Sequence, residues 1–308
     1  MELKTPSERD DLQQRQAQWA VLGVIGRSRV FGAIAVLKGA LQVEAFTGMS
    51  RSTRDIDLTL SVLPYSLDEA GRLLLKQHLE DALRKGLPTA APTGEWSLYA
   101  VSVKKAPPGK LPGRFGHDGF SAKVTLERRR SAQHLVAIDF SWGDLVGPPI
   151  GLSFNGTRLA LAQGADATFI RAYSPEEQIA EKLRAFLQKL PAHLNKIGRP
   201  HDQLPRYKDI CDVANLVRTS AELDWTQVAA GFKQKCLVRR VDCCSVDDFV
   251  ALPAGLPGIE LGYNAEGLGA ILAFGDAWAE FRGAIERVAT VGGLPGLTPL
   301  PDAAGLDR

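Results

Sequence analysis

The order of hydrophobic and polar positions divides the chain into two parts with different periodicity. In residues 96–104 and 120–126 apolar and polar side chains alternate, which is typical of strands that are buried on one face. After Ser174 the apolar residues recur at intervals of three and four, which predicts helices with one buried stripe. In the first of these helices the stripe consists of Ile179, Leu183, Phe186 and Leu190. We therefore predict an α/β domain over residues 1–173 and a mainly α-helical domain over residues 174–308.

The same patterns place the other elements of the first domain. Strands are expected at 34–37, 134–142 and 168–173, and helices at 7–26, 40–46 and 67–86. In the strand at 134–142, Leu135, Ala137 and Asp139 face one way, and Val136, Ile138 and Phe140 face the other. Asp139 is thus a carboxylate within an otherwise apolar strand.

In the second domain, Ser174 is expected to cap the first helix, with Pro175 at the first helical position and Glu177 closing a capping box. Lys182 lies at the edge of the buried stripe of this helix. A second helix begins at 206–209, and further helices are expected at 225–241 and 266–288.

Two of these later helices carry charged residues near their apolar stripes. Asp209 lies close to the edge of the stripe in the second helix, and Asp212 is expected further round towards solvent. The helix at 225–241 should present a basic face, formed by Lys233, Lys235, Arg239 and Arg240.

The segment 36–60 carries the strongest candidate chemistry. Asp55 and Asp57 are two residues apart on a predicted strand, so they share one face while Ile56 and Leu58 anchor the strand. Two carboxylates held so close repel each other unless a cation lies between them, and a hard divalent cation such as Mg²⁺ prefers oxygen ligands.

Gly39 follows a predicted strand and precedes a predicted helix, where backbone N–H groups can approach a phosphate closely. Together with the Asp pair this suggests a nucleoside triphosphate that is held by a glycine turn, with its metal on Asp55 and Asp57. An Asp-x-Asp pair alone is weak evidence, because such pairs also occur in loops and calcium sites.

Four motifs give the chain a family resemblance. LKGA at 37–40 followed by DIDL at 55–58 resembles the nucleotidyltransferase superfamily that includes DNA polymerase beta. AEKLRA at 180–185 and RYKDICDVANL at 206–216 narrow the resemblance to the AbiEii/AbiGii (MenT-like) toxins of bacterial toxin–antitoxin systems. The resemblance implies a mixed-sheet nucleotidyltransferase domain, with Asp139 as a third metal ligand beside Asp55 and Asp57.

The resemblance also assigns nucleotide contacts. It implies that Lys38, Gly39, Ala40 and Lys182 bind the nucleotide, and that Asp209 is a further essential acidic residue. Ala40 departs from the usual Gly-Ser or Gly-Gly, so the grip on the phosphates would rest on backbone donors. The alternatives are that Lys182 and Asp209 end a surface salt bridge, and that Asp139 is a buried carboxylate that caps a loop or pairs with an arginine. Asp144 replaces Asp139 if the strand register is shifted.

The resemblance implies that nucleotides, mainly pyrimidines, are added to the 3′ acceptor end of tRNA, which blocks translation, and that a cognate antitoxin exists. Transfer of a nucleotide or phosphate to a protein, or nucleotide binding with little catalysis, are the alternatives. Basic residues in or beside predicted loops could hold an RNA backbone or could be ordinary solvated residues. They are Arg51, Arg54, Lys196, Arg199, Arg206 and Lys208.

Composition narrows these possibilities. The net charge is +2, so contact with nucleic acid has to come from a local patch. The four cysteines lack the spacing of a zinc site and are expected to be reduced thiols. Without an apolar signal core or a long uncharged apolar run, neither secretion nor membrane spanning is expected, and we predict a cytoplasmic protein.

Overall fold

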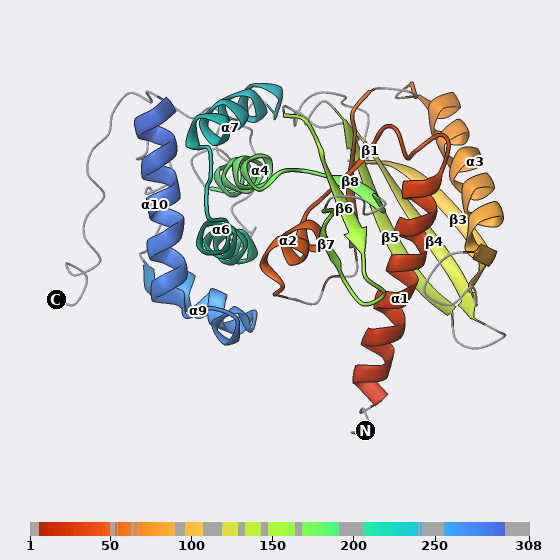
Figure 1. Ribbon diagram of the computed structural model, residues 1–308, viewed down its shortest axis with the longest axis horizontal. Helices are drawn as coiled ribbons and strands as arrows, with labels where there is room; N and C mark the ends of the chain where they lie inside the picture. Colours follow the sequence, from red (N-terminus) through yellow and green to blue (C-terminus); the bar gives the residue numbers. More distant parts are fainter. Residues whose placement is uncertain are drawn as a thin grey trace. The chain divides into compact units, whose positions relative to one another are not determined.

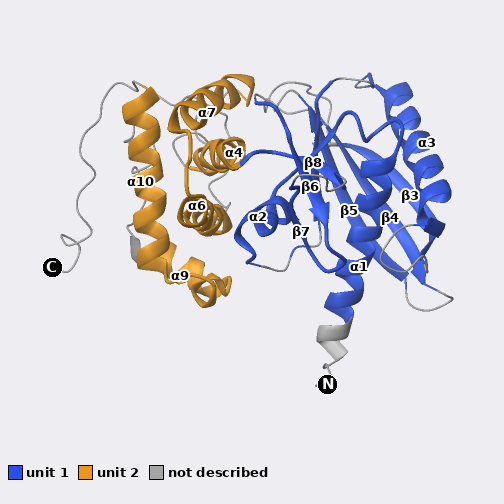
Figure 2. Ribbon diagram, in the orientation of Figure 1, with its two compact units in different colours: residues 1–174 blue, residues 175–308 orange. Residues whose placement is uncertain are grey.

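A computed structural model describes residues 6–49, 53, 55–62, 65, 66, 68–89, 96–106, 119–128, 133–142, 147–163, 168–190, 206–239, 241 and 256–292. The chain separates into two compact units, Met1–Ser174 and Pro175–Arg308 (Figure 2). The predicted mixed α/β fold is confirmed, with one mixed sheet in unit 1 and helices in both units.

Unit 1 contains three α-helices, one short 3-10 helix at Leu87–Thr89 and eight strands among its described residues. The helices are α1 (Pro6–Arg27), α2 (Ala40–Thr47) and α3 (Glu69–Gly86). The strands are β1 (Ala35–Lys38), β2 (Asp55–Leu60), β3 (Trp96–Ala106), β4 (Gly119–Arg128), β5 (Gln133–Trp142), β6 (Ile150–Phe154), β7 (Leu159–Leu161) and β8 (Ile170–Ala172). The short strands β6 and β7 were not anticipated from the sequence.

All eight strands form one sheet in the order β3-β4-β5-β2-β1-β8-β6-β7 (Figure 1). β2 pairs in parallel with β5, and β1 in parallel with β8, whereas the other neighbours are antiparallel. The two parallel pairs place β5 and β8, which come much later in the sequence, on either side of the antiparallel pair β1 and β2 at the centre of the sheet.

One face of the sheet packs against α1 and α3 (Figure 1). Leu75, Leu79 and Leu83 of α3 follow a helical stripe and are fully buried. On β5, Val136, Ile138 and Phe140 point into this core, whereas Leu135 and Asp139 are exposed. The predicted division of β5 into two faces is therefore confirmed.

The described part of unit 2 is helical (Figure 1). Its α-helices are α4 (Pro175–Leu187), α6 (Tyr207–Thr219), α7 (Trp225–Arg239), α9 (Leu256–Ala265) and α10 (Phe274–Gly292), with a 3-10 helix at Leu268–Ala270. The predicted helix at 266–288 is wrong at its start. Gly267 has a φ of 72°, in the left-handed region, and a helix cannot run through such a residue. α10 therefore begins only at Phe274.

Phe186 of α4 and Phe281 of α10 meet edge to face in the core of unit 2, with ring centroids 4.8 Å apart.

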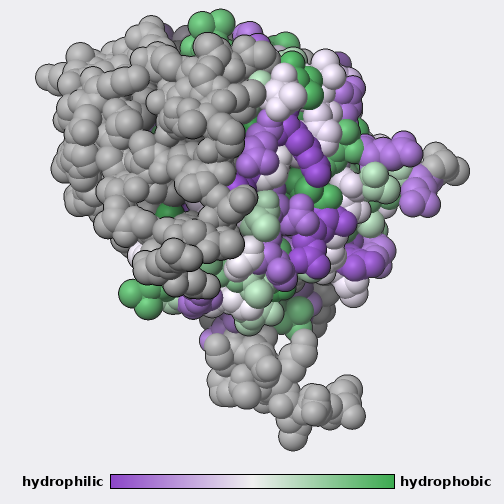
Figure 3. Space-filling model, turned by 90° about the vertical axis from the view of Figure 1, so that its left-hand side faces the viewer, coloured by the Kyte–Doolittle hydropathy of each residue, from purple (hydrophilic) through white to green (hydrophobic). Residues whose placement is uncertain are grey.

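On the side of the molecule that carries α10, hydrophilic and hydrophobic residues are interspersed among the coloured residues (Figure 3). Among the residues that the structure describes, no helix has the length and apolar character needed to cross a membrane.

The two faces of β5 predict opposite mutational effects. Ile138→Ala removes buried methyl groups and leaves a cavity, so we expect it to lower the free energy of unfolding by about 2–5 kcal/mol. Leu135→Ala, on the exposed face, should change the free energy by less than about 0.5 kcal/mol. Urea denaturation followed by circular dichroism measures both. Equal losses would contradict the assignment of the faces.

His134 predicts a pH dependence of stability. The side chain is buried, and its ring contacts Trp96 edge to face at 5.2 Å. Burial, reinforced by the charge of Arg128 and opposed by that of Asp10, lowers the pKa of His134 below its usual value. The unfolded chain therefore takes up the proton first, so His134 stabilises the fold above about pH 6.5 and loses this contribution as the pH falls further.

We expect the free energy of unfolding of the wild type to fall more steeply between about pH 7 and pH 5 than that of His134→Phe, which keeps an aromatic ring but does not titrate. The other histidines are present in both proteins, so their effects cancel in the comparison. Identical slopes would show that protonation of His134 is not coupled to folding.

Candidate functional site

The site is organised by Asp57 at the centre of the sheet. Asp57 lies opposite Lys38 of β1 on one side and opposite Asp139 of β5 on the other. Residues in register on neighbouring strands share a face and are separated by about 4.8 Å. Lys38, Asp57 and Asp139 thus form a row across three strands, and Asp55 lies on the same face, one step along β2 and opposite Ala137.

Alternation along β2 explains why this face is polar. Ile56 and Leu58 are fully buried against α1 and α3, so Asp55 and Asp57 must point to the opposite face. There Asp55 is exposed and Asp57 is half-buried. The structure therefore brings the predicted aspartates together on one face, although they come from strands about 80 residues apart in the sequence.

Asp139 is exposed, so the alternative of a buried carboxylate is wrong. The reason is that Asp139 belongs to the face of β5 that also carries exposed Leu135, opposite the face that packs into the core. Because Asp139 itself lies in register with Asp57, no shift to Asp144 is needed, and Asp144 lies outside the described residues.

Gly39 joins β1 to α2 and lies directly against Asp57. It has a φ of 76°, which residues with a side chain rarely adopt. A Cβ at this position would be 2.1 Å from Oδ2 of Asp57. Only glycine therefore allows the first turn of α2, with Ala40 at its start, to begin beside the carboxylate.

Lys38 contacts Ser141 and Tyr173. Its Nζ donates a hydrogen bond to Oγ of Ser141 on β5 at 2.8 Å and lies 5.9 Å from the centre of the Tyr173 ring. These contacts keep a positive charge at the end of the row that contains Asp57 and Asp139. Neither Ser141 nor Tyr173 was anticipated as part of the site.

Arg171 is a candidate that the sequence analysis missed. It lies on β8 opposite Val36 of β1. Val36 and Lys38 are two residues apart on β1, so Arg171 lies on the same face of the sheet as Lys38. Its Nε and Nη2 are buried, and neither has a hydrogen-bond partner among the residues that the structure describes. Buried guanidinium donors without acceptors are costly, and a bound anion would satisfy them. The signal in the sequence is a single arginine within the short apolar strand at 170–172.

The carboxylates suit a hard cation by chemistry. Asp55, Asp57 and Asp139 offer only oxygen donors, which Mg²⁺ prefers. Within the described ranges, however, no group of three or more histidine, cysteine, aspartate or glutamate side chains stands arranged to hold a metal ion. The donor set thus fits Mg²⁺ in kind, but the three ligands are not already gathered into a cage.

In unit 2, Lys182 is at the centre of a buried ion cluster. Its Nζ lies 2.9 Å from Oδ1 of Asp209 and 2.7 Å from Oδ2 of Asp212, and Arg206 also contacts Asp209. Lys182 and Asp209 therefore form an ion pair, as the alternative of a surface salt bridge assumed. The pair is buried, however, and does not lie at the surface. The expectation that Asp212 faces solvent is also wrong, because Asp212 is only 2% exposed and its carboxylate is bound by the Lys182 ammonium.

A second buried cluster links α4 to α7. Nζ of Lys235 lies 2.6 Å from Oε1 of Glu177 and 3.9 Å from Oε2 of Glu181. Lys235 is 1% exposed and Arg239 is also buried, so the predicted basic face of α7 is wrong. Arg240 lies outside the described residues. The charges of α7 are used inside the helical unit because carboxylates of α4 neutralise Lys235 there.

The basic residues considered for RNA contact are only partly described. Arg51, Arg54, Lys196 and Arg199 lie outside the described residues. Arg206 forms an ion pair with Asp209, although its side chain is 43% exposed, and Nζ of Lys208 lies 3.2 Å from Oε2 of Glu266. Of the four cysteines, Cys211 and Cys236 are buried thiols, and Cys243 and Cys244 lie outside the described residues.

The Lys182 cluster predicts a large loss of stability on truncation. Lys182→Met leaves Asp209 and Asp212 buried together without the ammonium between them, so we expect a loss of about 3–5 kcal/mol in the free energy of unfolding. The double variant with Asp212→Asn should recover part of this loss, since it removes one of the two charges. Chemical denaturation measures both; a single variant as stable as the wild type would contradict the buried cluster.

Comparison with known proteins identifies the family. No curated protein sequence matches the chain. Among solved structures, a protein described as JHP933 from Helicobacter pylori is similar, with 12% identity over 94% of this chain and 95% of that chain and a TM-score of 0.49. The family model described as nucleotidyl transferase AbiEii toxin, type IV TA system, matches residues 27–286, which cover most of each unit. The chain therefore belongs to the AbiEii family of nucleotidyltransferase toxins of type IV toxin–antitoxin systems.

Proposed function

We propose that the chain transfers a nucleotide from an NTP in an Mg²⁺-dependent reaction, at the face of the sheet that carries Asp55, Asp57 and Asp139. The observation that carries this proposal is the row of Lys38, Asp57 and Asp139 in register, with Gly39 against the Asp57 carboxylate. Family membership supplies the reaction class, and the row supplies the charges that this class of reaction needs.

Asp57 and Asp139, with Asp55 beside them, would hold Mg²⁺ through carboxylate oxygens. A bound metal ion would offset the charge of the triphosphate and favour the ionised form of an acceptor hydroxyl. Gly39 and Ala40 would offer backbone N–H groups at the start of α2 to the phosphates.

Cationic side chains complete the proposed phosphate site. Because Ala40 has no hydroxyl to offer, Lys38 and Arg171 are proposed to balance the negative charge of the triphosphate. We also propose that Lys182 and Asp209 act on the nucleotide. This part of the proposal rests on the family resemblance alone. Since the Lys182 ammonium already binds two carboxylates, we expect Lys182 to contribute less to phosphate binding than Lys38 does.

The proposed acceptor is the 3′ end of tRNA, with pyrimidine nucleotides preferred and translation blocked as the result. All three of these proposals come from the family resemblance. Membership of a type IV toxin–antitoxin family implies a cognate antitoxin as partner. Transfer to a protein side chain, and nucleotide binding with little catalysis, are the two other outcomes that an experiment has to separate.

Incubation of the protein with each of the four labelled NTPs, total RNA and Mg²⁺ tests the proposal. Label in RNA of tRNA size, lost when Mg²⁺ is chelated, is the expected result, with more label from CTP or UTP than from ATP or GTP. Label in protein would select a protein acceptor, and absence of label from both would select a binding protein.

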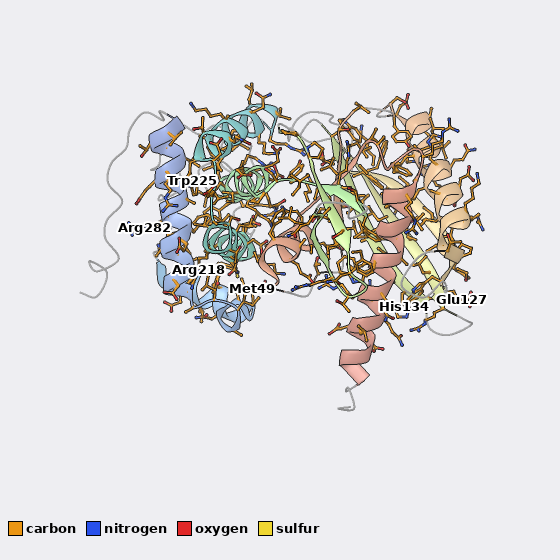
Figure 4. The ribbon with its side chains drawn as sticks, in the orientation of Figure 1. Met49, Glu127, His134, Arg218, Trp225 and Arg282 are labelled. Carbon is orange, nitrogen blue, oxygen red and sulfur yellow. The ribbon has the colours of Figure 1, made fainter. Side chains whose placement is uncertain are left out.

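Asp57→Asn should lower nucleotide incorporation at least about 100-fold, because it removes a charged ligand from the centre of the row. The fold should persist, because the change removes a carboxylate that lies next to another one. Growth arrest on expression should be lost with Asp57→Ala. The matched control is Asp276→Asn, which also neutralises an aspartate but on α10 of unit 2, where the exposed carboxylate lies 3.8 Å from Arg218 (Figure 4). Equal growth arrest by Asp57→Ala and the wild type would rule out this chemistry.

A further inference from the structure

We propose that the face of β3, β4 and β5 that points away from α1 and α3 binds the single-stranded 3′ segment of an RNA acceptor, and that Tyr99 stacks on one of its bases. The proposal rests on the proposed nucleotidyl transfer, since it extends the same site. We call this surface the acceptor face. Three features support it: its register with the site, a bulge that exposes Tyr99, and the placement of its lysines.

The acceptor face is continuous with the aspartates. Lys104 of β3 lies opposite Ser121 of β4, Ser121 opposite Asp139, and Asp139 opposite Asp57. In the next row, Lys123 of β4 lies opposite Ala137, which in turn lies opposite Asp55. A chain that leaves the reacting position at Asp57 and Asp139 therefore passes directly onto β4 and β3.

Tyr99 is presented by an irregularity in the edge of the sheet. Pairing between β3 and β4 passes from Leu98 opposite Leu126 to Ala100 opposite Thr125, which leaves Tyr99 as the extra residue of a β-bulge. Its side chain is 61% exposed. Bulges beside functional sites redirect side chains, and an exposed aromatic ring is the usual platform on which a nucleic-acid base stacks.

The two lysines of this face are placed to hold a phosphate. Lys104 and Lys123 are diagonal neighbours on adjacent strands, about 7–8 Å apart at their Cα atoms, so their charges repel unless an anion lies near them. Lys104 alone could be explained as protection of the edge strand β3. Lys123 lies on β4, which is inside the sheet, and has no such explanation.

The rest of the face suits a single strand better than a folded partner. Between the lysines and the aspartates, the face is formed by the small residues Ser121 and Ala137, over which bases and backbone can approach closely. Among the described residues, Leu135, which is 48% exposed, is the other large exposed apolar residue on this part of the face. Two separated apolar side chains are less than a stable protein interface requires, whereas splayed bases need only isolated stacking positions.

The spacing defines which part of the RNA is bound. Tyr99 lies two strands and four residues away from the row of Asp139, which corresponds to about 16 Å. Tyr99 therefore cannot stack on the nucleotide that reacts. It contacts a base upstream of the 3′ end, and it should affect binding of the RNA but not that of the NTP.

The test uses the full chain, a fluorescent single-stranded RNA that ends in CCA with a 3′ hydroxyl, and a blunt double-stranded RNA of the same length. Fluorescence anisotropy measures RNA binding, and incorporation of labelled nucleotide gives kcat and KM for both substrates. We expect Tyr99→Ser to weaken binding of the single strand at least about 5-fold, and Tyr99→Phe to bind like the wild type, because a phenyl ring still stacks. Lys123→Gln should also weaken binding and should reduce its salt dependence.

KM for the NTP should stay unchanged in all three variants. Leu237→Ser, a change at a 73% exposed apolar residue of α7, is the control. Equal RNA affinity of Tyr99→Ser and wild type would overturn the acceptor face, and so would equal binding of the double-stranded RNA or no binding of RNA by the wild type. If the wild type binds the single strand through Tyr99 but incorporates no nucleotide, the acceptor face holds and the proposed nucleotidyl transfer fails.

Discussion

The parallel pairing of β2 with β5 is the constraint on which the proposed chemistry depends. It places Asp57 opposite Asp139, about 4.8 Å apart at the backbone, so two like charges are fixed side by side on one face of a rigid sheet. The repulsion between them is tolerated because Ile56 and Ile138 lie opposite each other on the other face, fully buried in the core of unit 1. Hydrophobic burial on one face thus fixes two carboxylates side by side on the other, where a bound cation would lower their mutual repulsion.

In unit 2, by contrast, charged side chains are buried in ion pairs. Lys182 and Lys235 are buried, but each is neutralised by two carboxylates of the same unit. Such clusters contribute little net stability compared with an apolar core, yet they penalise any packing of α4, α6 and α7 that separates the partners. In unit 1 the charges remain on an accessible face of the sheet, where a ligand can reach them; in unit 2 they fix the arrangement of helices.

Local patterns predicted much of this arrangement, and the failures have a common cause. Alternation along β2 and β5 gave the correct faces for Asp55, Asp57 and Asp139, because side-chain direction follows from the strand alone. Which strand pairs with which, and in what register, is a non-local property, so the rows across the sheet and the bulge at Tyr99 were not predictable. The burial of Asp212 and Lys235 depends on partners from other helices, and helical position alone therefore assigned both to solvent.

We propose that Asp57 and Asp139 act together as one charged unit. A double-mutant cycle measures this directly, from the rates of nucleotide incorporation by Asp57→Asn, by Asp139→Asn and by the protein that carries both changes. If the two residues serve one function, the double variant should be no more than a few-fold slower than the slower single variant. Losses that multiply would show that Asp57 and Asp139 act independently and do not share one function.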